Sequence, residues 1–540
     1  MELISQHAKR IMEGCKERAR DAGLRFQDET LEYIVTNRDM LALGPKNMIP
    51  TLYDYWVQDV EVLREQGRYE LYPNNPYETV INTRPPISFY NDNNPDWLNV
   101  MIFYHVIGHI DFFQNNLYFR HTWEYDFASK ALADKRLLAK LRSEKGRWVD
   151  YVIEFARSVD NLVGYFATLG EFNRAKKPSL LDYYFDVFLQ DEKKLSVSSY
   201  VKEITLYNQL LRDYPEDGET RFLDNVKGRY SELESYYRKK TAGDSKNGRA
   251  DILQFILEHS EFLAKEENRW MKTVIEVIRT TSLYFQPQIR TKILNEGWAS
   301  YWHEQLFLQD DRIRGHEVDF ALVHAKVTSM PRVGLNPYAL GMRLFSYLKD
   351  KGDKGKLSYD YVRLHDKYQR RKYDTGTMGG RDYIFQLREN FADSMFINSC
   401  IDQDFVDLHK LFVVGKRLDK ARMTWQYYVK SKKAEDYKKM VVDSLYHPPS
   451  VVVSVSDTNS LVINHVFEGK PLVRDFIDGT MMGLEYLWGR PVVLYTSEAM
   501  PVKAKAASEG DKEENPVQHY IWRRYRYTMA GRRLKRELVE

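Results

Sequence analysis

The sequence predicts a mainly α fold, in which a large helical domain is followed by a small α+β domain. Up to about residue 400, apolar side chains recur at helical spacing. After Asp402 the apolar runs become short and β-branched, which is typical of strands. Aromatic residues make up 14% of the chain, and such rings favour heavily packed helical interfaces. We therefore expect a helical core domain at 1–403, a small α+β domain at 404–498, and a tether with a basic aromatic tail at 499–540.

The first domain is expected to consist of helices joined by irregular segments. Residues 1–23 and 27–42 are predicted to form short surface helices, and the stretch from Tyr72 to Pro95 to be irregular because it is rich in Pro and Asn. Between Trp97 and Phe119 almost every side chain is apolar or aromatic, which predicts a helix buried on all sides. Further helices are expected at 128–170, 179–193, 198–212 and 250–283, with Pro287 as a stop, and a new helix from Thr291.

The second domain is expected to contain a duplicated ββα unit. Its apolar runs and helical patterns follow in the order ββαββαβ over residues 404–498. Residues 499–516 are rich in Ala, Lys, Glu and Pro, which predicts a tether. The basic aromatic segment from Arg523 onward is interpreted as a solvated helix that packs its Tyr side chains, with nucleic-acid or partner binding as the alternative.

Charge and cysteine content exclude several classes of protein. The formal net charge is only +3, which argues against nucleic acid or a membrane surface as the main partner. Cys15 and Cys400 are the only two cysteines, so the sequence offers neither a disulfide framework nor a thiolate zinc site. No apolar run is long enough to span a membrane, and the first residues lack a secretion signal pattern. We expect a cytoplasmic protein.

The helix predicted after Trp97 contains two candidate metal ligands. His105 and His109 are one helical turn apart, so both imidazoles project from the same face. Burying two imidazoles is costly unless a metal or a hydrogen-bond network satisfies them. Gly108 lowers helix propensity, which indicates that a ligand or another backbone approaches closely there. The alternative is a pair of core histidines bonded to neighbouring carbonyls and carboxylates.

The segment 295–303 provides a candidate third ligand. Glu296 and His303 are seven residues apart, two helical turns, and therefore share a face. A carboxylate beside two imidazoles is a donor set that suits a divalent transition metal, with zinc as the first choice. We predict that His105, His109 and Glu296 bind this metal. His303 and His324 are predicted to stand beside it and to transfer protons.

Four sequence blocks carry a resemblance to a known family, and the chain is identified as a member of the SpoVR (stage V sporulation protein R-like) family. The blocks are His105-Val-Ile-Gly-His-Ile-Asp-Phe-Phe-Gln-Asn-Asn116, Tyr284-Phe-Gln-Pro-Gln288, Thr291-Lys-Ile-Leu-Asn-Glu-Gly-Trp-Ala-Ser-Tyr-Trp-His303 and Asn336-Pro-Tyr-Ala-Leu-Gly341. A weaker match extends over about 30–498. The resemblance implies a bacterial stress or sporulation system, linked to the spore cortex, with an AAA+-type serine protein kinase and a von Willebrand A-like protein as partners.

The two ligand-bearing helices also resemble those of gluzincins, in which His-Glu-x-x-His and a later Asn-Glu-Gly helix bind the metal. The glutamate that acts there as general base is Val106 in this chain, and Asp111, His303, Glu304 and His324 are the candidates to replace it. The expected function is that of a metal-binding, hydrolase-like protein acting on a peptide or a cell-wall-derived amide. The alternative is a non-catalytic regulatory or scaffolding partner of the kinase system.

Overall fold

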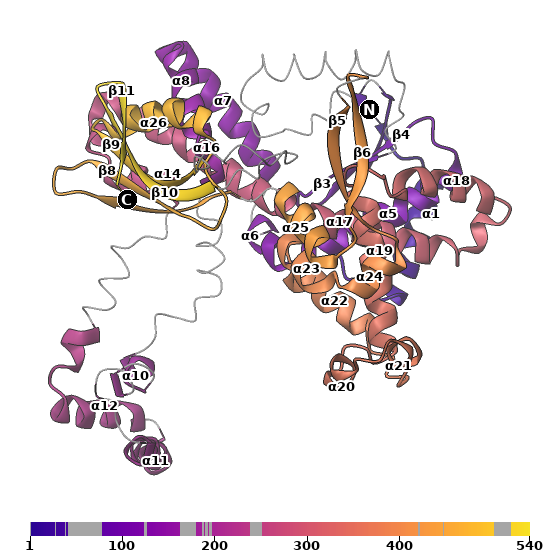
Figure 1. Cartoon of the computed structure of the whole chain (residues 1–540), viewed down its shortest axis with the longest axis horizontal. Helices are drawn as coiled ribbons and strands as arrows, with labels where there is room; N and C mark the ends of the chain where they lie inside the picture. The colour runs from indigo at the N-terminus through magenta and orange to yellow at the C-terminus, as the bar shows by residue number, and fades with distance from the viewer. Residues whose placement is uncertain are drawn as a thin grey trace, which may run out of the picture. The chain divides into compact units, whose positions relative to one another are not determined.

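The computed structural model describes most of the chain (Figure 1). The described residues are 2–27, 29–37, 39–40, 78–123, 127–162, 180–185, 188–189, 193, 197–215, 217–237, 251–419, 422–445, 448–501 and 520–539. Most of them are helical, as predicted. The chain divides into two compact units, unit 1 with residues 1–146 and 280–447, and unit 2 with residues 147–279 and 448–540. Every helix among the described residues is too short or too polar to cross a membrane.

Unit 1 is built around a buried helix, α5. Its bounds are Asp96–Asn115, and the run from Leu98 to Phe113 is fully buried, which confirms the predicted helix. The side chains are apolar almost throughout, so burial on all sides is the stable arrangement. The other helices of unit 1 are α1 (Gln6–Asp21), α6 (Arg120–Trp123), α7 (Phe127–Lys145), α17 (Lys292–Phe307), α18 (Glu317–Thr328), α19 (Pro337–Asp353), α20 (Tyr359–Arg363), α21 (Lys367–Lys372), α22 (Gly380–Asn390), α23 (Asp393–Cys400), α24 (Gln403–Leu408) and α25 (Ala434–Ser444).

Glycines allow α5, α17 and α19 to cross at very short distances. A Cβ atom added to Gly108 of α5 would lie 2.7 Å from the Cα of Ala299 in α17. A Cβ atom added to Gly341 of α19 would lie 2.7 Å from the Cα of Gly297 in α17. Neither position has room for a side chain, because the obstructing atoms belong to backbone. The close approach of another backbone at Gly108 is therefore confirmed.

A four-stranded sheet in unit 1 corrects the sequence-based expectation for this region. Its strands lie in the order β1-β2-β4-β3, with β2 and β4 parallel and the other pairs antiparallel. The strands are β1 (Glu2–Leu3), β2 (Leu31–Val35), β3 (Glu78–Ile81) and β4 (Ile87–Asn91). The helix predicted at 27–42 is wrong over β2, and the irregular segment predicted before Pro95 is wrong over β3 and β4. Pairing between distant segments outweighs local propensity here.

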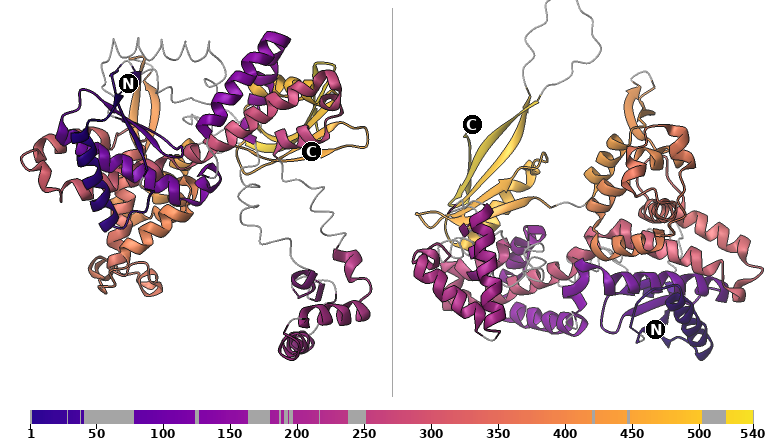
Figure 2. Two further views of the ribbon diagram at one scale, coloured as in Figure 1. Left: turned by 180° about the vertical axis from the view of Figure 1, so that it is seen from behind. Right: turned by 90° about the horizontal axis from the view of Figure 1, so that it is seen from below.

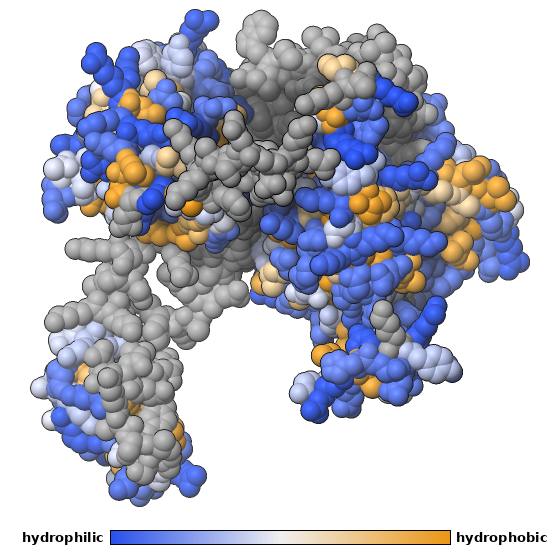
Figure 3. Space-filling model, viewed as in Figure 1, coloured by the Kyte–Doolittle hydropathy of each residue, from blue (hydrophilic) through white to orange (hydrophobic). Residues whose placement is uncertain are grey.

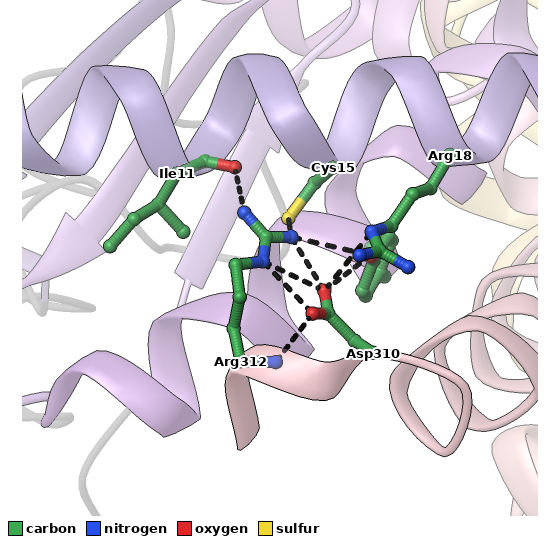
Figure 4. Close-up of polar contacts among 6 residues, drawn as sticks. Ile11, Cys15, Arg18, Asp310 and Arg312 are labelled. Carbon is green, nitrogen blue, oxygen red and sulfur yellow. Dashed lines mark hydrogen bonds and ion pairs between the residues drawn. The ribbon is translucent and has the colours of Figure 1, made fainter. Parts of the chain in front are cut away.

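A cluster of polar side chains fixes α1 to the segment after α17 (Figure 4). The Arg312 guanidinium donates hydrogen bonds to Asp310 (2.9 Å), to the Ile11 carbonyl (3.0 Å) and to Cys15 Sγ (3.2 Å). Burial alone would raise the pKa of Asp310, but hydrogen bonds from Arg312 and Tyr104 outweigh burial and lower this pKa to about 2. Burial raises the pKa of the Cys15 thiol to about 11, so the thiol remains protonated.

Strands β5 (Val413–Asp419) and β6 (Thr424–Ser431) form a separate antiparallel hairpin in unit 1. From residue 404 to 501 the elements follow in the order α24, β5, β6, α25, β7, β8, α26, β9. The compact units divide after residue 447, inside the predicted 404–498 domain. The predicted domain boundaries at 403 and 498 stay a prediction.

Unit 2 contains a five-stranded sheet in the order β11-β10-β9-β8-β7 (Figures 1 and 2). Strands β8 and β9 are parallel and are connected through α26 (Arg474–Trp488), which packs against β9, β10 and α8. The strands are β7 (Ser450–Val455), β8 (Leu461–Val466), β9 (Val492–Pro501), β10 (Tyr520–Ala530) and β11 (Arg533–Leu538). The helices are α8 (Trp148–Arg157), α10 (Leu180–Tyr183), α11 (Val197–Asp213), α12 (Gly218–Arg229), α14 (Ile252–His259) and α15 (Glu261–Ala264), while α16 (Arg269–Arg290) contributes residues to both units.

Two further expectations are corrected by the observed elements. The basic aromatic segment after Arg523 forms strands β10 and β11 rather than a helix, with Tyr525, Tyr527 and Met529 buried on one face. Buried and more exposed side chains alternate along β10, which is the period of a strand. Pro287 does not end its helix, because α16 continues to Arg290.

Candidate metal centre

The crossing of α5 and α17 brings together the three predicted ligands. One ligand atom from each of His105, His109 and Glu296 lies within 4.8 Å of the other two. The two imidazole Nε2 atoms are 3.1 Å apart, and His109 Nε2 is 3.5 Å from Glu296 Oε2. The His105 and His109 side chains are buried, whereas the Glu296 carboxylate is partly exposed. Both His Nε2 atoms and one carboxylate oxygen therefore converge on a small volume.

A line of polar contacts runs from His105 through two further histidines to the partly exposed carboxylate of Glu304. His105 Nδ1 lies 2.9 Å from His303 Nδ1, and His303 Nε2 lies 2.9 Å from His324 Nδ1. His324 Nε2 is 3.3 Å from Glu304 Oε1. Burial, followed by the neighbouring histidines, lowers the pKa of His105 and of His303 well below the ordinary value, so both rings are neutral. The structure thus places His303 and His324 in one line behind His105.

One set of tautomers suits every contact along this line. A carboxylate only accepts hydrogen bonds, so in this set the His324 Nε2 atom carries a hydrogen and its Nδ1 atom accepts. His303 then donates from Nε2 and accepts at Nδ1, and His105 donates from Nδ1. The Nε2 atom of His105 is left with a lone pair. It faces the Nε2 atom of His109.

The Asn295 amide favours one tautomer of His109. His109 Nδ1 lies 2.9 Å from the side-chain oxygen of Asn295, which only accepts hydrogen bonds. With this oxygen as its partner, His109 carries its hydrogen on Nδ1 and has a lone pair on Nε2. In this pair of tautomers, two lone pairs face each other across 3.1 Å, whereas a hydrogen on either Nε2 atom would join the two rings by a hydrogen bond.

Two residues of this site were not predicted from the sequence. Glu78, on β3, places a carboxylate oxygen 4.0 Å from His105 Nε2. Tyr338, in α19, stacks on the His105 ring with centroids 6.1 Å apart and hydrogen-bonds to Glu296. Burial, with added effects of the Glu296 and Glu78 carboxylates, raises the pKa of Tyr338 above its ordinary value. Tyr338 lies in the recognisable sequence block that begins with Asn336, so the sequence could have indicated it as a site residue. Glu78 lies in a segment without a recognisable sequence pattern.

The structure places Asp111, one candidate general base, in a different set of contacts. Its carboxylate accepts hydrogen bonds from the Arg25 amide (2.7 Å) and from Trp298 Nε1 (2.8 Å). Arg388, which is also fully buried, lies 3.4 Å from the same carboxylate. Burial raises the pKa of Asp111 to about 6. Asp111 therefore connects α5 with α17 and α22.

A distant carboxylate holds the start of α17. Asp393 accepts hydrogen bonds from the amides of Ile293 and Leu294, each at 2.9 Å. Amides in the first turn of a helix have no partner within the helix, so a carboxylate there satisfies them. Asn295 and Glu296 follow directly, and Asp393 thereby sets the position of two site residues.

Fold and site together define a mostly helical protein in which two buried histidines and a partly exposed carboxylate converge where two helices cross. The chain belongs to the SpoVR family, since the family model described as "SpoVR like protein" matches residues 3–447. A relative from Escherichia coli (strain K12), the uncharacterized protein YcgB, is 25% identical over 335 residues, which cover 58% of this chain and 58% of the length of YcgB. No solved structure gave a significant match.

Proposed function

We propose that this chain binds a divalent transition metal, with zinc as the first choice, through His105, His109 and Glu296. The observation that supports this proposal is the convergence of the two imidazole Nε2 atoms, 3.1 Å apart, with a carboxylate oxygen of Glu296. When both Nε2 atoms carry lone pairs, a cation shared between them turns their repulsion into attraction. Ligand nitrogens at about 2.1 Å from a tetrahedral zinc are themselves about 3.4 Å apart, close to the spacing seen here. Two nitrogens and one carboxylate oxygen are a common donor set for zinc.

The reaction we propose is hydrolysis of a peptide or a cell-wall-derived amide in bacterial stress or sporulation. A bound metal of this kind polarises a carbonyl group and activates water. The arrangement resembles that of gluzincins, but Val106 cannot accept a proton. Glu78, which is partly exposed, places a carboxylate oxygen 4.0 Å from His105 Nε2 and is the group we assign as proton acceptor. His303 and His324 orient His105 and provide a path for a proton toward Glu304.

Metal analysis of the purified full-length protein tests the proposal. We expect about one equivalent of metal in the wild type and less than about a tenth in His109→Ala. His365→Ala is the matched control, because His365 is exposed and outside the site. The wild type with bound metal, but not His109→Ala, is expected to release amines from a panel of peptides and cell-wall fragments. Absence of metal from the wild type, or equal metal in His109→Ala, would exclude the proposed ligands.

The replacement of the usual base by Val106 favours a second candidate function. In this proposal the chain is a non-catalytic regulatory or scaffolding partner of the AAA+-type serine protein kinase system that the family resemblance implies. The site would then stabilise the helical core only. Co-purification of the kinase and the von Willebrand A-like protein with both the wild type and His109→Ala, without any hydrolysis, is the expected result for this function. If neither the wild type nor His109→Ala co-purified with these two partners, the regulatory or scaffolding function would be excluded.

A further inference from the structure

The hairpin β5–β6 exposes apolar side chains on one of its faces, and this face is independent of the histidine cluster. Cross-strand pairs place Val414 opposite Val429, Lys416 opposite Tyr427, and Leu418 opposite Trp425. Paired residues project to the same side of a sheet. Four of these side chains, those of Leu418, Trp425, Tyr427 and Val429, are between 42% and 60% exposed. We call the six paired side chains the hairpin face.

The opposite side of the hairpin has a different character. There Arg417 donates a hydrogen bond to Gln426, and Gln426 donates one to Asp419. Tyr428 covers Gly415, at which a Cβ atom would overlap the tyrosine ring. This side therefore combines one exposed tyrosine, Tyr428, with polar side chains that hydrogen-bond to one another, whereas the hairpin face exposes several apolar side chains.

Such an exposed face needs an explanation. A two-stranded hairpin is only marginally stable by itself, and among the described residues no further strand pairs with either edge. The described surface seen in Figure 3 is mostly hydrophilic. A contiguous apolar surface on an otherwise polar protein usually marks an interaction site. Tryptophan and tyrosine are also the side chains that contribute most to binding energy at protein interfaces.

Charge indicates what kind of partner fits. Between Lys410 and Lys433 the sequence has eight Lys and Arg residues and a single acidic residue, Asp419. A second copy of the chain would bring equal positive charge against the hairpin, so self-association is disfavoured. An acidic partner is attracted instead. We propose that the hairpin face binds a protein segment that carries apolar side chains flanked by Asp and Glu.

The distribution of the cations argues for protein rather than nucleic acid. Lys416 is the one cation on the hairpin face, and its ammonium group lies over the Trp425 ring, 5.1 Å from the centroid. Arg417 belongs to the opposite side. Bases that stack on aromatic rings need cations beside those rings to bind the phosphates. The apolar side chains Val414, Leu418 and Val429 instead suit aliphatic side chains of a protein.

Binding of labelled peptides to the full-length protein tests the proposal. The probe is a synthetic peptide in which Leu and Glu alternate, and its counterpart has Lys in place of Glu. We expect the acidic peptide to bind, the basic one not to bind, and the double variant Trp425→Ser/Tyr427→Ser to weaken binding at least about tenfold. The variant Lys416→Glu should weaken binding of the acidic peptide and allow the basic peptide to bind.

The matched control is Tyr359→Ser/Tyr368→Ser, since both tyrosines are at least 64% exposed and lie on α20 and α21. This variant should bind the acidic peptide as the wild type does. An unchanged unfolding midpoint shows that the aromatic variant is folded. The proposal is overturned if the acidic peptide does not bind, if the aromatic and control variants bind it equally, if single-stranded oligothymidine binds more tightly than the peptide, or if the protein dimerises through the hairpin.

Discussion

Substitution of Gly108 by alanine tests whether the helix crossing positions the candidate site. The added Cβ atom would lie 2.7 Å from Ala299 Cα, whereas ordinary contacts begin at 3.4 Å, so α5 and α17 would have to separate by about 0.7 Å. Overpacking of this kind costs about 3 kcal/mol at the upper end of its usual range. Alanine recovers about 1 kcal/mol through its higher helix propensity. We therefore expect a net loss of about 2 kcal/mol in the free energy of unfolding.

The assay is urea unfolding of the metal-free protein, followed by metal titration of the same samples. The matched control is Gly479→Ala in α26, where an added Cβ atom meets nothing within 4 Å and only the gain of about 1 kcal/mol remains. Separation of α5 from α17 should also weaken metal binding by about tenfold or more, because His105 and His109 lie on one helix and Glu296 on the other. If Gly108→Ala were as stable as Gly479→Ala and bound metal like the wild type, the inference from the crossing would be wrong.

Three further predictions concern single carboxylates. Glu304→Ala removes the carboxylate that contacts His324 Nε2, and affinity for the proposed metal, measured by competition with a chelator, should fall about 10- to 100-fold. Glu304→Gln retains a side-chain oxygen acceptor and should keep most of this affinity. Asp393→Ala leaves the amides of Ile293 and Leu294 without an acceptor and should lower the free energy of unfolding by about 1–3 kcal/mol, as thermal or urea unfolding will measure. The pKa of Asp310 is lowered to about 2, so the ionised carboxylate contributes its full stabilisation above pH 4. This contribution should be lost as the pH falls from about 4 to 2. Over this range the urea unfolding midpoint of the wild type should therefore drop by more than that of Asp310→Asn.

Much of the helical core could be predicted because its signals are local. The apolar run of α5 and the spacing of His105 and His109 depend only on the helical repeat. Gly108 also indicated a close backbone approach within α5, although the sequence did not identify Ala299 as the residue in contact. The candidate ligands that α5 and α17 bring together could be predicted because the Asn295-Glu-Gly297 segment carries its own pattern within one helix.

The features that were not predicted depend on contacts between distant segments. Strand β2 pairs with β4, more than fifty residues later, and Glu78 approaches His105 only through β3 of the same sheet. Asp393 reaches the start of α17 from about a hundred residues away. The alternation of tyrosine and arginine in β10 was visible in the sequence, but its basic composition suggested a solvated helix. In such a segment, alternation of side-chain type at every second residue is a better guide to secondary structure than a basic composition.

The alternative interpretation of His105 and His109 as ordinary core histidines can be examined atom by atom. It accounts for both Nδ1 atoms, which have acceptors in His303 and Asn295. The contact between the two Nε2 atoms is a hydrogen bond if one ring carries its hydrogen on Nε2, which a neutral imidazole does without becoming charged. The partner of that ring's Nδ1 atom must then donate, either His303 to His105 or a turned Asn295 amide to His109. A divalent cation at the site would instead take the Nε2 lone pairs of both rings, and the Glu296 carboxylate would offset part of its charge. The two interpretations therefore differ in the hydrogen on Nε2, and metal analysis of the purified protein separates them.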